Sequence, residues 1–397
     1  MKKTLILLLL VTGLYSCKHE KTLHNAVETI QAKTELKADA ADLFEQIKVV
    51  ALETNDSSLV GLFISRIEVW DDRIFILNEL QSHNNILCFD LSGRFLFKIE
   101  RTGQGPGEDV DLYDFLIDKN LNHLVLLNGI DRAMHFDMQG NFLYNIYSKD
   151  QYFPRYTVYL NDSTYLASNE GGVETGVPKG TSLIYLDART MNVREKSSDM
   201  DEYSYNAGHN RLSVSENRAL GFSYNDSIYD VSDINNIHVE YIIDNGSWQA
   251  KAKKKLRHDI DQLTGYPEQI QLLTDFFNEH YFSGKLMHIK AIHENDKYLA
   301  LSCSKPVKKT RDIIDYVLFH DKQNSRTYNS ENIDFGGVKL FNCSIRGADE
   351  SLYCILYSTF SDEDKAKIGN SPVFTEADRK KLVEFQEEDN PLIIVLK

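Results

Sequence analysis

The chain has 397 residues, of which 42% are hydrophobic and 26% charged, a composition typical of a globular protein and not of a disordered one. Its 44 basic and 59 acidic residues give a formal net charge of −15, which opposes binding to phosphate backbones, so we expect no nucleic-acid partner. Aromatic residues make up 11% of the chain and favour β-structure, because their rings pack well across paired strands.

The first residues predict an export signal followed by a lipid attachment site. A basic start precedes an apolar run over residues 4–12, which is too short to cross a bilayer and is typical of a secretory signal peptide. The motif Leu14-Tyr15-Ser16-Cys17 then resembles the lipobox of bacterial lipoproteins, whose cysteine is acylated. We predict a signal peptide over 1–16, a lipidated polar tether over 17–42, and anchoring in the outer membrane on its periplasmic or cell-surface side. An ordinary signal peptide with a chance cysteine is the alternative.

A repeated pattern of short strands fills most of the remaining chain. The element Phe-Asp-x-x-Gly occurs at residues 89–93 and again at 136–140, each time between two predicted strands. Copies of the second strand of the unit recur roughly every 40–55 residues, the spacing of four-stranded propeller blades. The equivalent positions are Ile74, Leu124, Tyr165, Ala219, Tyr298 and Leu352. The pattern predicts an all-β, six-bladed β-propeller over residues 43–397.

Two further segments complete the predicted propeller. Residues 249–264 and 268–281 have helical periodicity, which predicts a helical hairpin inserted over about 249–283 between blades 4 and 5. The basic run on its first helix either docks a partner or is a solvated helix face. The apolar run over 392–396 is expected to pair with residues 47–52, because this pairing of the chain ends would close the ring and remove an open edge.

Three stretches make the chain resemble the six-bladed β-propeller lipoproteins of Bacteroidetes, which are similar to NHL-repeat and TolB-like propellers. They are residues 52–90, the loop Gly103-Gln104-Gly105-Pro106-Gly107-Glu108, and the terminal Asn390-Pro391-Leu392-Ile393-Ile394. The loop is the most specific of the three. The resemblance implies a fold and a location but no reaction.

The glycine-rich loop is also a candidate binding site. Its glycines allow a close backbone approach to a ligand, with Arg101, Gln104 and Glu108 as contacts, although a structural turn between blades is the alternative. An acidic cluster follows, in which carboxylates at close spacing would suit calcium or would form a solvated acidic turn. The cluster consists of Glu108, Asp109, Asp111 and Asp114.

Asparagines end the second strand in each of the first three blades. Asn78, Asn128 and Asn169 hold equivalent places and are expected to line one face of the propeller. Side-chain amides in such a ring could bind a sugar or a peptide. The alternative is that they cap the strands by bonding to nearby backbone.

The cysteines and histidines yield no metal or redox motif. Cys343 and Cys354 flank a predicted hairpin turn over 346–350, so a symmetric hairpin would place them opposite each other and permit a disulfide. Two buried thiols are the alternative. The histidines show no ligand spacing, and we predict neither a metal nor a cofactor.

These features favour a lipid-anchored extracytoplasmic module that is attached to the membrane through its N-terminal lipid. Its predicted partner is an unknown small ligand, glycan or protein. The alternative is an extracytoplasmic enzyme, a lyase or hydrolase acting on glycans or peptides, with its site at the central channel. The sequence leaves open whether the protein is catalytic.

Overall fold

The structure is a computed structural model that describes the chain from residue 27 onward with internal gaps. The described residues are 27–61, 63–79, 84–100, 103, 105, 112–128, 132–150, 154–169, 183–197, 213–215, 218–220, 227–244, 255–256, 258–260, 262–282, 287–307, 312–340, 346–347 and 351–397. The predicted signal peptide and Cys17 lie outside this set.

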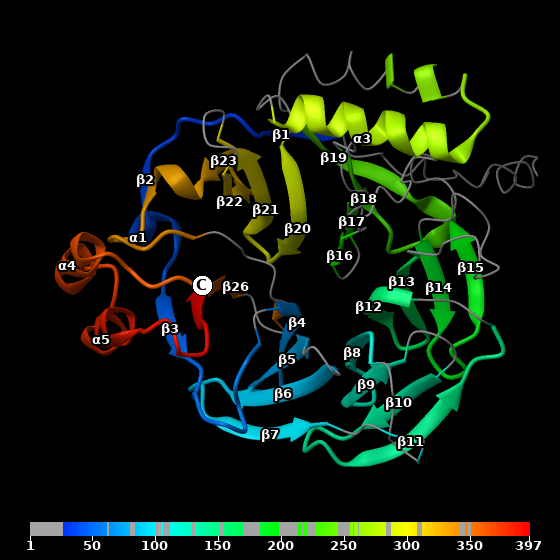
Figure 1. The fold of residues 1–397 in the computed structure, drawn as a ribbon, viewed down its shortest axis with the longest axis horizontal. Helices are drawn as coiled ribbons and strands as arrows, with labels where there is room; N and C mark the ends of the chain where they lie inside the picture. The colour runs from blue at the N-terminus through cyan, green and yellow to red at the C-terminus, as the bar shows by residue number, and fades with distance from the viewer. Residues whose placement is uncertain are drawn as a thin grey trace, which may run out of the picture.

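Six β-sheets are arranged as blades around a central axis, which confirms the predicted six-bladed propeller (Figure 1). Blade 1 contains β4 (Phe63–Trp70), β5 (Arg73–Glu79), β6 (Asn84–Asp90) and β7 (Phe95–Ile99). Blade 2 contains β8 (Asp114–Asp118), β9 (His123–Leu127), β10 (Arg132–Phe136) and β11 (Phe142–Tyr147). Blade 3 contains β12 (Pro154–Asn161), β13 (Thr164–Asn169), β14 (Leu183–Asp187) and β15 (Val193–Ser197).

The other three blades include strands from distant parts of the chain. Blade 4 contains β16 (Ser213–Ser215), β17 (Arg218–Leu220), β18 (Ser227–Asp230) and β19 (His238–Asp244), with β1 (Glu28–Gln31) added at its outer edge. Blade 5 contains β20 (His288–Glu294), β21 (Tyr298–Pro306), β22 (Ile313–Asp321) and β23 (Arg326–Asn329). Blade 6 contains β26 (Leu352–Leu356), β27 (Leu392–Leu396) and β3 (Ile47–Ala51). Short 3-10 helices occur at Ile234–Asn236 and Ser330–Asn332.

The hydrophobic core is divided into clusters that lie between neighbouring blades. Blades 1 and 2, for example, bury Phe75, Phe115 and Phe136 between them without solvent exposure. Each blade is apolar on both faces, because each face packs against a different neighbour. A fully buried phenylalanine contributes about 2–3 kcal/mol, so these interfaces explain why the aromatic residues are concentrated in the blade strands.

The N-terminal segment runs along the outside of blades 4, 5 and 6. β1 pairs in parallel with β19, and the buried Ile30 packs into the core between blades 4 and 5. Further on, β2 (Ala38–Asp39) pairs with β24 (Ile333–Asp334), and α1 (Ala40–Leu43) leads to Phe44 in the core between blades 5 and 6. The predicted tether over 17–42 is therefore too long: residues from 28 onward are held by strand pairing and apolar burial, which their polar composition concealed.

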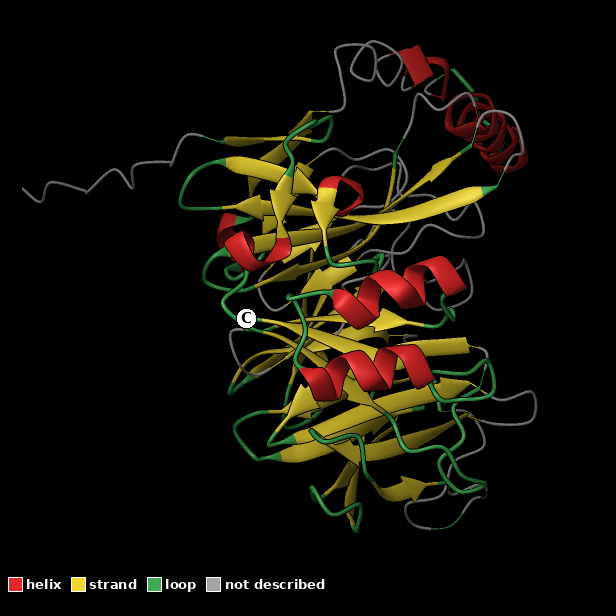
Figure 2. Ribbon diagram, turned by 90° about the vertical axis from the view of Figure 1, so that its left-hand side faces the viewer, coloured by secondary structure: helices red, strands yellow, loops and turns green. Residues whose placement is uncertain are grey.

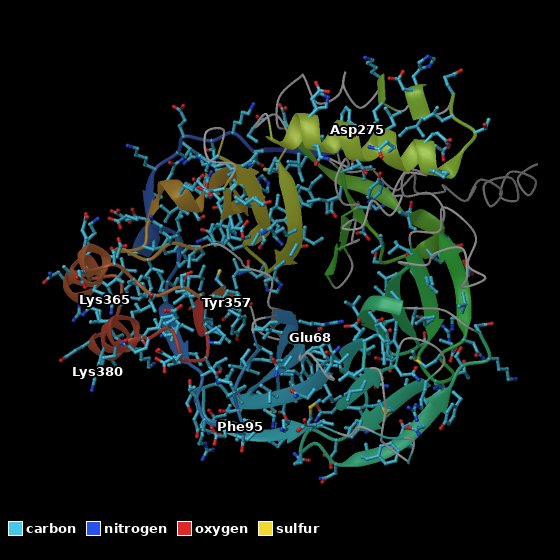
Figure 3. All side chains as sticks on the ribbon, in the orientation of Figure 1. Glu68, Phe95, Asp275, Tyr357, Lys365 and Lys380 are labelled. Carbon is cyan, nitrogen blue, oxygen red and sulfur yellow. The ribbon has the colours of Figure 1, made fainter. Side chains whose placement is uncertain are left out.

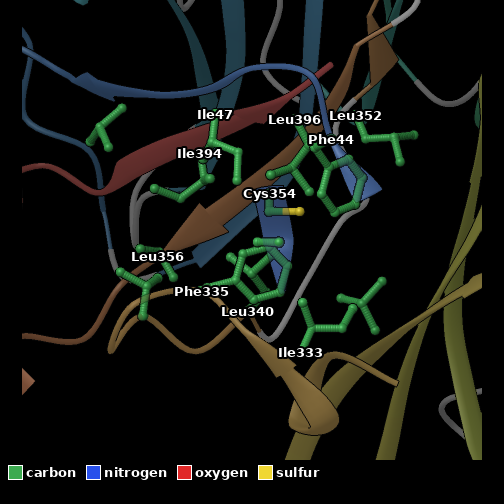
Figure 4. Packing of buried hydrophobic residues seen from close by; sticks show 14 of the residues in the cluster. Phe44, Ile47, Ile333, Phe335, Leu340, Leu352, Cys354, Leu356, Ile394 and Leu396 are labelled. Carbon is green, nitrogen blue, oxygen red and sulfur yellow. The ribbon is translucent and has the colours of Figure 1, made fainter. Parts of the chain in front are cut away.

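Blade 6 combines both ends of the described chain. β27 lies between β26 and β3, with Ile394 opposite both Cys354 and Val49. Figure 4 shows this core, in which Phe44, Phe335 and Leu396 pack around Cys354. The charged stretch before β27 forms α4 (Asp362–Asn370) and α5 (Glu376–Glu384), capped by Ser361 and Thr375. Lys381 of α5 donates to the Val49 carbonyl at 2.5 Å, so α5 covers the edge of β3.

The predicted hairpin around Cys354 is wrong in its pairing. Residues Arg346–Gly347 form β25, which pairs in parallel with Glu68 and Val69 of β4 and extends the sheet of blade 1. β26, which contains the buried Cys354, pairs with β27. Cys343 lies outside the described residues, so its pairing with Cys354 stays a prediction.

A helical segment between blades 4 and 5 has its own small core. α3 (Tyr266–Phe282) packs Leu272 and Phe276 against the buried Leu256 and Ile260 of a preceding helical stretch. α3 lies beside β1 and β19 at the outer edge of the disc in Figure 1 and contacts β21, and in the edge-on view of Figure 2 it lies to one side of the disc. None of the helices that the structure describes is long and apolar enough to span a bilayer.

Candidate binding face

The two faces of the disc carry connections of very different length. On one face the strands are joined by tight turns, and we call it the short-turn face; its turns include 71–72, 119–122, 162–163 and 295–297. On the opposite face, the long-loop face, the connections include 100–113, 170–182, 245–287 and 357–391. Binding residues concentrate on long connections that a rigid scaffold positions, so the long-loop face is the candidate site.

The short turns are built by aspartates, which explains the repeated Phe-Asp-x-x-Gly element. The Asp90 carboxylate accepts hydrogen bonds from the backbone of Ser92 and Arg94, and Asp137 does the same for Gln139 and Asn141. Burial raises the pKa of both carboxyls, but these hydrogen bonds outweigh it and hold each pKa below its ordinary value. The element is therefore a turn motif. Gly93 has a φ of +92° and lies against the Ala51 carbonyl, where a side chain would not fit.

The predicted asparagines lie at the strand ends of the long-loop face. The buried Asn78 accepts a hydrogen bond from the Gly61 backbone at 2.7 Å and donates to Asn85 at 3.2 Å. Asn128 accepts from the Arg132 backbone at 3.0 Å. Both amides thus bond to their own chain, in the manner of the strand-capping alternative. The side chain of Asn169 lies outside the described residues.

The glycine-rich loop joins β7 to β8 and so belongs to the long-loop face. Its predicted contacts Arg101, Gln104 and Glu108 lie outside the described residues, as do Asp109 and Asp111 of the acidic cluster. Asp114, the last member of the cluster, is buried in β8. For Asp114 the predicted solvated turn is wrong, because an ion pair with an arginine on the neighbouring blade compensates its charge.

Arg66 is the centre of a buried charge cluster on the innermost strands. It donates to Asp114 at 2.8 Å and through Nε to Glu68 at 2.7 Å, and all three side chains are almost fully buried. Figure 3 labels Glu68 at the inner end of blade 1. Burial lowers the pKa of Arg66, but the charges of Asp114 and Glu68 outweigh that effect and hold its pKa above the ordinary value. Arg66 is therefore always charged, and its single positive charge is shared between the two carboxylates.

The same cluster continues into blade 3. The second oxygen of Asp114 accepts from the backbone N–H of Thr157 on β12 at 2.7 Å, so one carboxylate connects β4, β8 and β12. The Arg66 guanidinium also lies 5.2 Å from the centre of the Phe115 ring. This network aligns the first three blades, and it places two carboxylates on the innermost strands, near the propeller axis.

Apolar side chains are exposed where inner segments reach the long-loop face. Leu59 precedes β4, Tyr113 precedes β8 and Tyr357 follows β26, and they are 57%, 38% and 51% exposed. Surrounding protein still raises the pKa of Tyr357 to about 12, although half of its surface is accessible. These three residues, which we call the apolar rim, could contact a bound molecule.

Asn390 holds the connection between blades 6 and 1 beside the apolar rim. Its buried side chain accepts from the Val60 backbone at 2.8 Å and donates to the carbonyls of Glu53 and Ser58 at 2.7 and 2.8 Å. The segment that carries Leu59 is thereby fixed from the far end of the chain. Sequence reasoning noticed Asn390 only as part of a family resemblance, since nothing local indicates partners more than 300 residues away.

A histidine pair lies near the opposite face, between blades 2 and 3, with His135 buried and His123 partly exposed. The Nδ1 atoms of His123 and His135 are 3.3 Å apart, and the ring of Tyr144 stacks on His135 at 4.5 Å. Burial lowers the pKa of His135 to about 4, with a further contribution from His123 and an opposing one from Asp118. Across the described part of the chain no three ligating side chains are grouped closely enough to hold a metal.

Taken together, the blades and the asymmetric faces define a six-bladed β-propeller with a single face of long connections. A family model matches residues 22–397, and the chain belongs to this family, whose description is "Domain of unknown function (DUF4934)". No significant match was found among curated proteins.

Solved structures share this fold. A protein of Bacteroides fragilis that is thought to be exported is 19% identical, with a TM-score of 0.67 over 94% of this chain and 99% of that one. A member of the DUF4221 family from Bacteroides vulgatus is 12% identical, with a TM-score of 0.50 over 89% of this chain and 96% of that one. At these identities the similarity establishes the fold only.

Proposed function

We propose that this protein is an exported, lipid-anchored propeller that binds a small ligand, a glycan or a protein partner on its long-loop face. The lipobox-like motif ending at Cys17 supports the anchor, and the similar Bacteroides fragilis protein that is thought to be exported agrees with the location. The observation that carries the binding role is the apolar rim of Leu59, Tyr113 and Tyr357, set among the long connections of one face.

The rim has the properties of a binding surface for physical reasons. A propeller holds its strand ends rigidly, so side chains at those ends lose little conformational freedom when they bind a partner. A tyrosine combines a large apolar ring with a polar hydroxyl, which suits both sugars and proteins. The surrounding connections add contacts without changing the scaffold.

The binding role is tested with the soluble Cys17→Ala form of the full chain. Tyr357→Ala and Tyr113→Ala are compared with Leu96→Ala, which removes an exposed leucine from the outer strand β7. The probes are a glycan microarray and an array of short peptides. Truncating an anchor residue costs about 2 kcal/mol or more of binding free energy. We therefore expect roughly 30-fold weaker binding in the tyrosine variants and unchanged binding in the control. Equal binding by all three variants would refute the assignment to this face.

The enzyme alternative is supported by one observation, the two buried carboxylates Glu68 and Asp114 close to the channel. General acid–base chemistry commonly uses such pairs. Here both carboxylates accept hydrogen bonds from Arg66, so the pair would have to open before either could take up a proton. Cleavage of glycans or peptides that is abolished by Asp114→Asn, with the fold retained, would establish the enzyme reading instead.

A further inference from the structure

The direction of β1 shows from which side the N-terminal tether reaches the propeller. β1 is parallel to β19, with Glu28 opposite Tyr241 and Gln31 opposite Asp244. β19 is the last strand of blade 4 and starts at the turn after β18, on the short-turn face. Residues before Glu28 therefore come from the short-turn side.

A buried contact fixes this entry point. The Glu28 carboxylate lies 3.0 Å from Nε2 of His320, whose other ring nitrogen lies 3.0 Å from the Thr327 hydroxyl. His320 is fully buried and is the second-last residue of β22, next to the short turn between β22 and β23. Glu28 is thus held to blade 4 at the middle of β19 and to blade 5 near the short-turn end of β22.

The tether beyond this point is short. Residues 18–27 separate Cys17 from Glu28, which is ten residues. Fully extended, they span at most about 35 Å. A strand of seven residues such as β19 is itself about 23 Å long, so the tether can exceed the length of one strand by only about 12 Å.

The short-turn face also carries side chains suited to a lipid headgroup region. Leu121 and Leu91 are 45% and 39% exposed at turns of blades 2 and 1. Trp70 lies beside Leu121, donates from its indole to Asn122 at 2.8 Å, and has the Lys119 ammonium 5.5 Å above its ring. Tryptophan and lysine of this kind combine an apolar body with a polar end and favour membrane interfaces.

The long-loop face is less suited to lie flat on a membrane. The inserted connection 245–287 and the helical connection 357–391 both start and end on the long-loop face. In the edge-on view, α3 stands on that side of the disc, away from the C-terminus on the short-turn side (Figure 2). A flat approach of the long-loop face to a membrane would meet α3 first, whereas α4 and α5 lie at the outer edge of blade 6 (Figure 1).

We propose that the short-turn face rests on the membrane, and that the long-loop face with its apolar rim points away from it. The inference rests on the proposed acylation of Cys17. The partner of the short-turn face is an uncharged or zwitterionic bilayer surface, because a net charge of −15 repels anionic lipid. The orientation leaves the binding face accessible to molecules that approach from the aqueous side.

The test uses the full acylated chain in phosphatidylcholine vesicles that contain a lipid with a nitroxide-labelled headgroup. A fluorophore is attached at Leu121→Cys on the short-turn face or at Tyr357→Cys on the long-loop face. A reference variant carries it at Leu96→Cys on β7, the outer strand of blade 1. Each variant also carries Cys343→Ala to prevent labelling at that position. The three cysteines that the structure describes, Cys88, Cys303 and Cys354, are buried. Flotation with the vesicles is measured first, and quenching of the fluorophore second.

We expect quenching at residue 121 to exceed that at residue 357 several-fold, with residue 96 between them. Protein that floats but is quenched more strongly at residue 357, or equally at all three, overturns the orientation while leaving the anchor intact. Protein that does not float overturns the anchor, and the orientation with it. Flotation that persists in Cys17→Ala also overturns the anchor, because the chain would then bind without its acyl groups.

Discussion

Replacing Arg66 with methionine tests whether the buried charge cluster stabilises the packing of the blades. Methionine keeps most of the length and apolar stem of the side chain but removes the charge and its hydrogen bonds to Glu68 and Asp114. The carboxylates of Glu68 and Asp114 would then stay buried but lose this cation. The change tests the cluster alone, because no other charged partner of Arg66 is seen among the described residues.

The expected loss follows from the burial of all three groups. Removing one partner of a buried ion pair costs about 3–5 kcal/mol. A domain of roughly 350 residues unfolds with an entropy near 0.7 kcal/mol per kelvin, so the melting temperature should fall by about 4–7 °C. The triple variant Arg66→Met, Glu68→Gln, Asp114→Asn has no charge left in this cluster and keeps an acceptor for Thr157, so we expect it to recover most of the loss.

Thermal unfolding of the soluble Cys17→Ala form, followed by circular dichroism and calorimetry, measures both effects. An Arg66→Met protein with an unchanged melting temperature would contradict the assigned role of the cluster. A triple variant as unstable as the single one would show that the arginine acts through its packing on Phe115, and not through its charge.

The remaining predictions concern the chain ends and the turns. Asn390→Ala removes three hydrogen bonds to the backbone of Glu53, Ser58 and Val60 and should cost about 3 kcal/mol in denaturant unfolding, against about 1 kcal/mol for Asn128→Ala; equal losses would refute the role of Asn390. Cys17→Ala should move the protein from the membrane to the soluble fraction on cell fractionation, and retention would argue against acylation. The lowered pKa values of Asp90 and Asp137 mean that their stabilisation is complete above about pH 4 and is lost as the pH falls through the folded-state values. The stability difference between the wild type and Asp90→Asn should therefore vanish on acidification, and a difference that persists at low pH would contradict this account.

The fold could be predicted because its signals are local and repeated. Short apolar strands such as residues 86–90 and 95–99, joined by an aspartate turn, appear in several copies, and each copy strengthens the interpretation of the others. The strand in the N-terminal segment was missed because it has no such repeated local signal. Residues 28–31 are a single polar-flanked stretch whose strand conformation comes from a partner more than 200 residues away.

The candidate site was less accessible to sequence reasoning. The sequence indicated Asn78 and Asn128 as candidate binding residues, and their side chains accept hydrogen bonds from the backbone of Gly61 and Arg132. It predicted that Asp114 lies in a solvated acidic turn or in a calcium site. Nothing near Asp114 indicates that Arg66, on another blade, lies within 2.8 Å. A charged residue is expected at the surface unless a partner is known, and here the partner is supplied by the packing of the blades.

The sequence by itself determined the number of blades, their order and the composition of their interfaces, because hydrophobic periodicity and turn chemistry act between residues that are close in the chain. Tertiary structure alone decided which faces carry the long connections, where Arg66 meets Asp114, how Asn390 holds the first loop, and from which side the tether enters. Each of these depends on contacts between blades or between the chain ends. Such contacts arise from the closure of the ring and leave no periodic trace in the sequence.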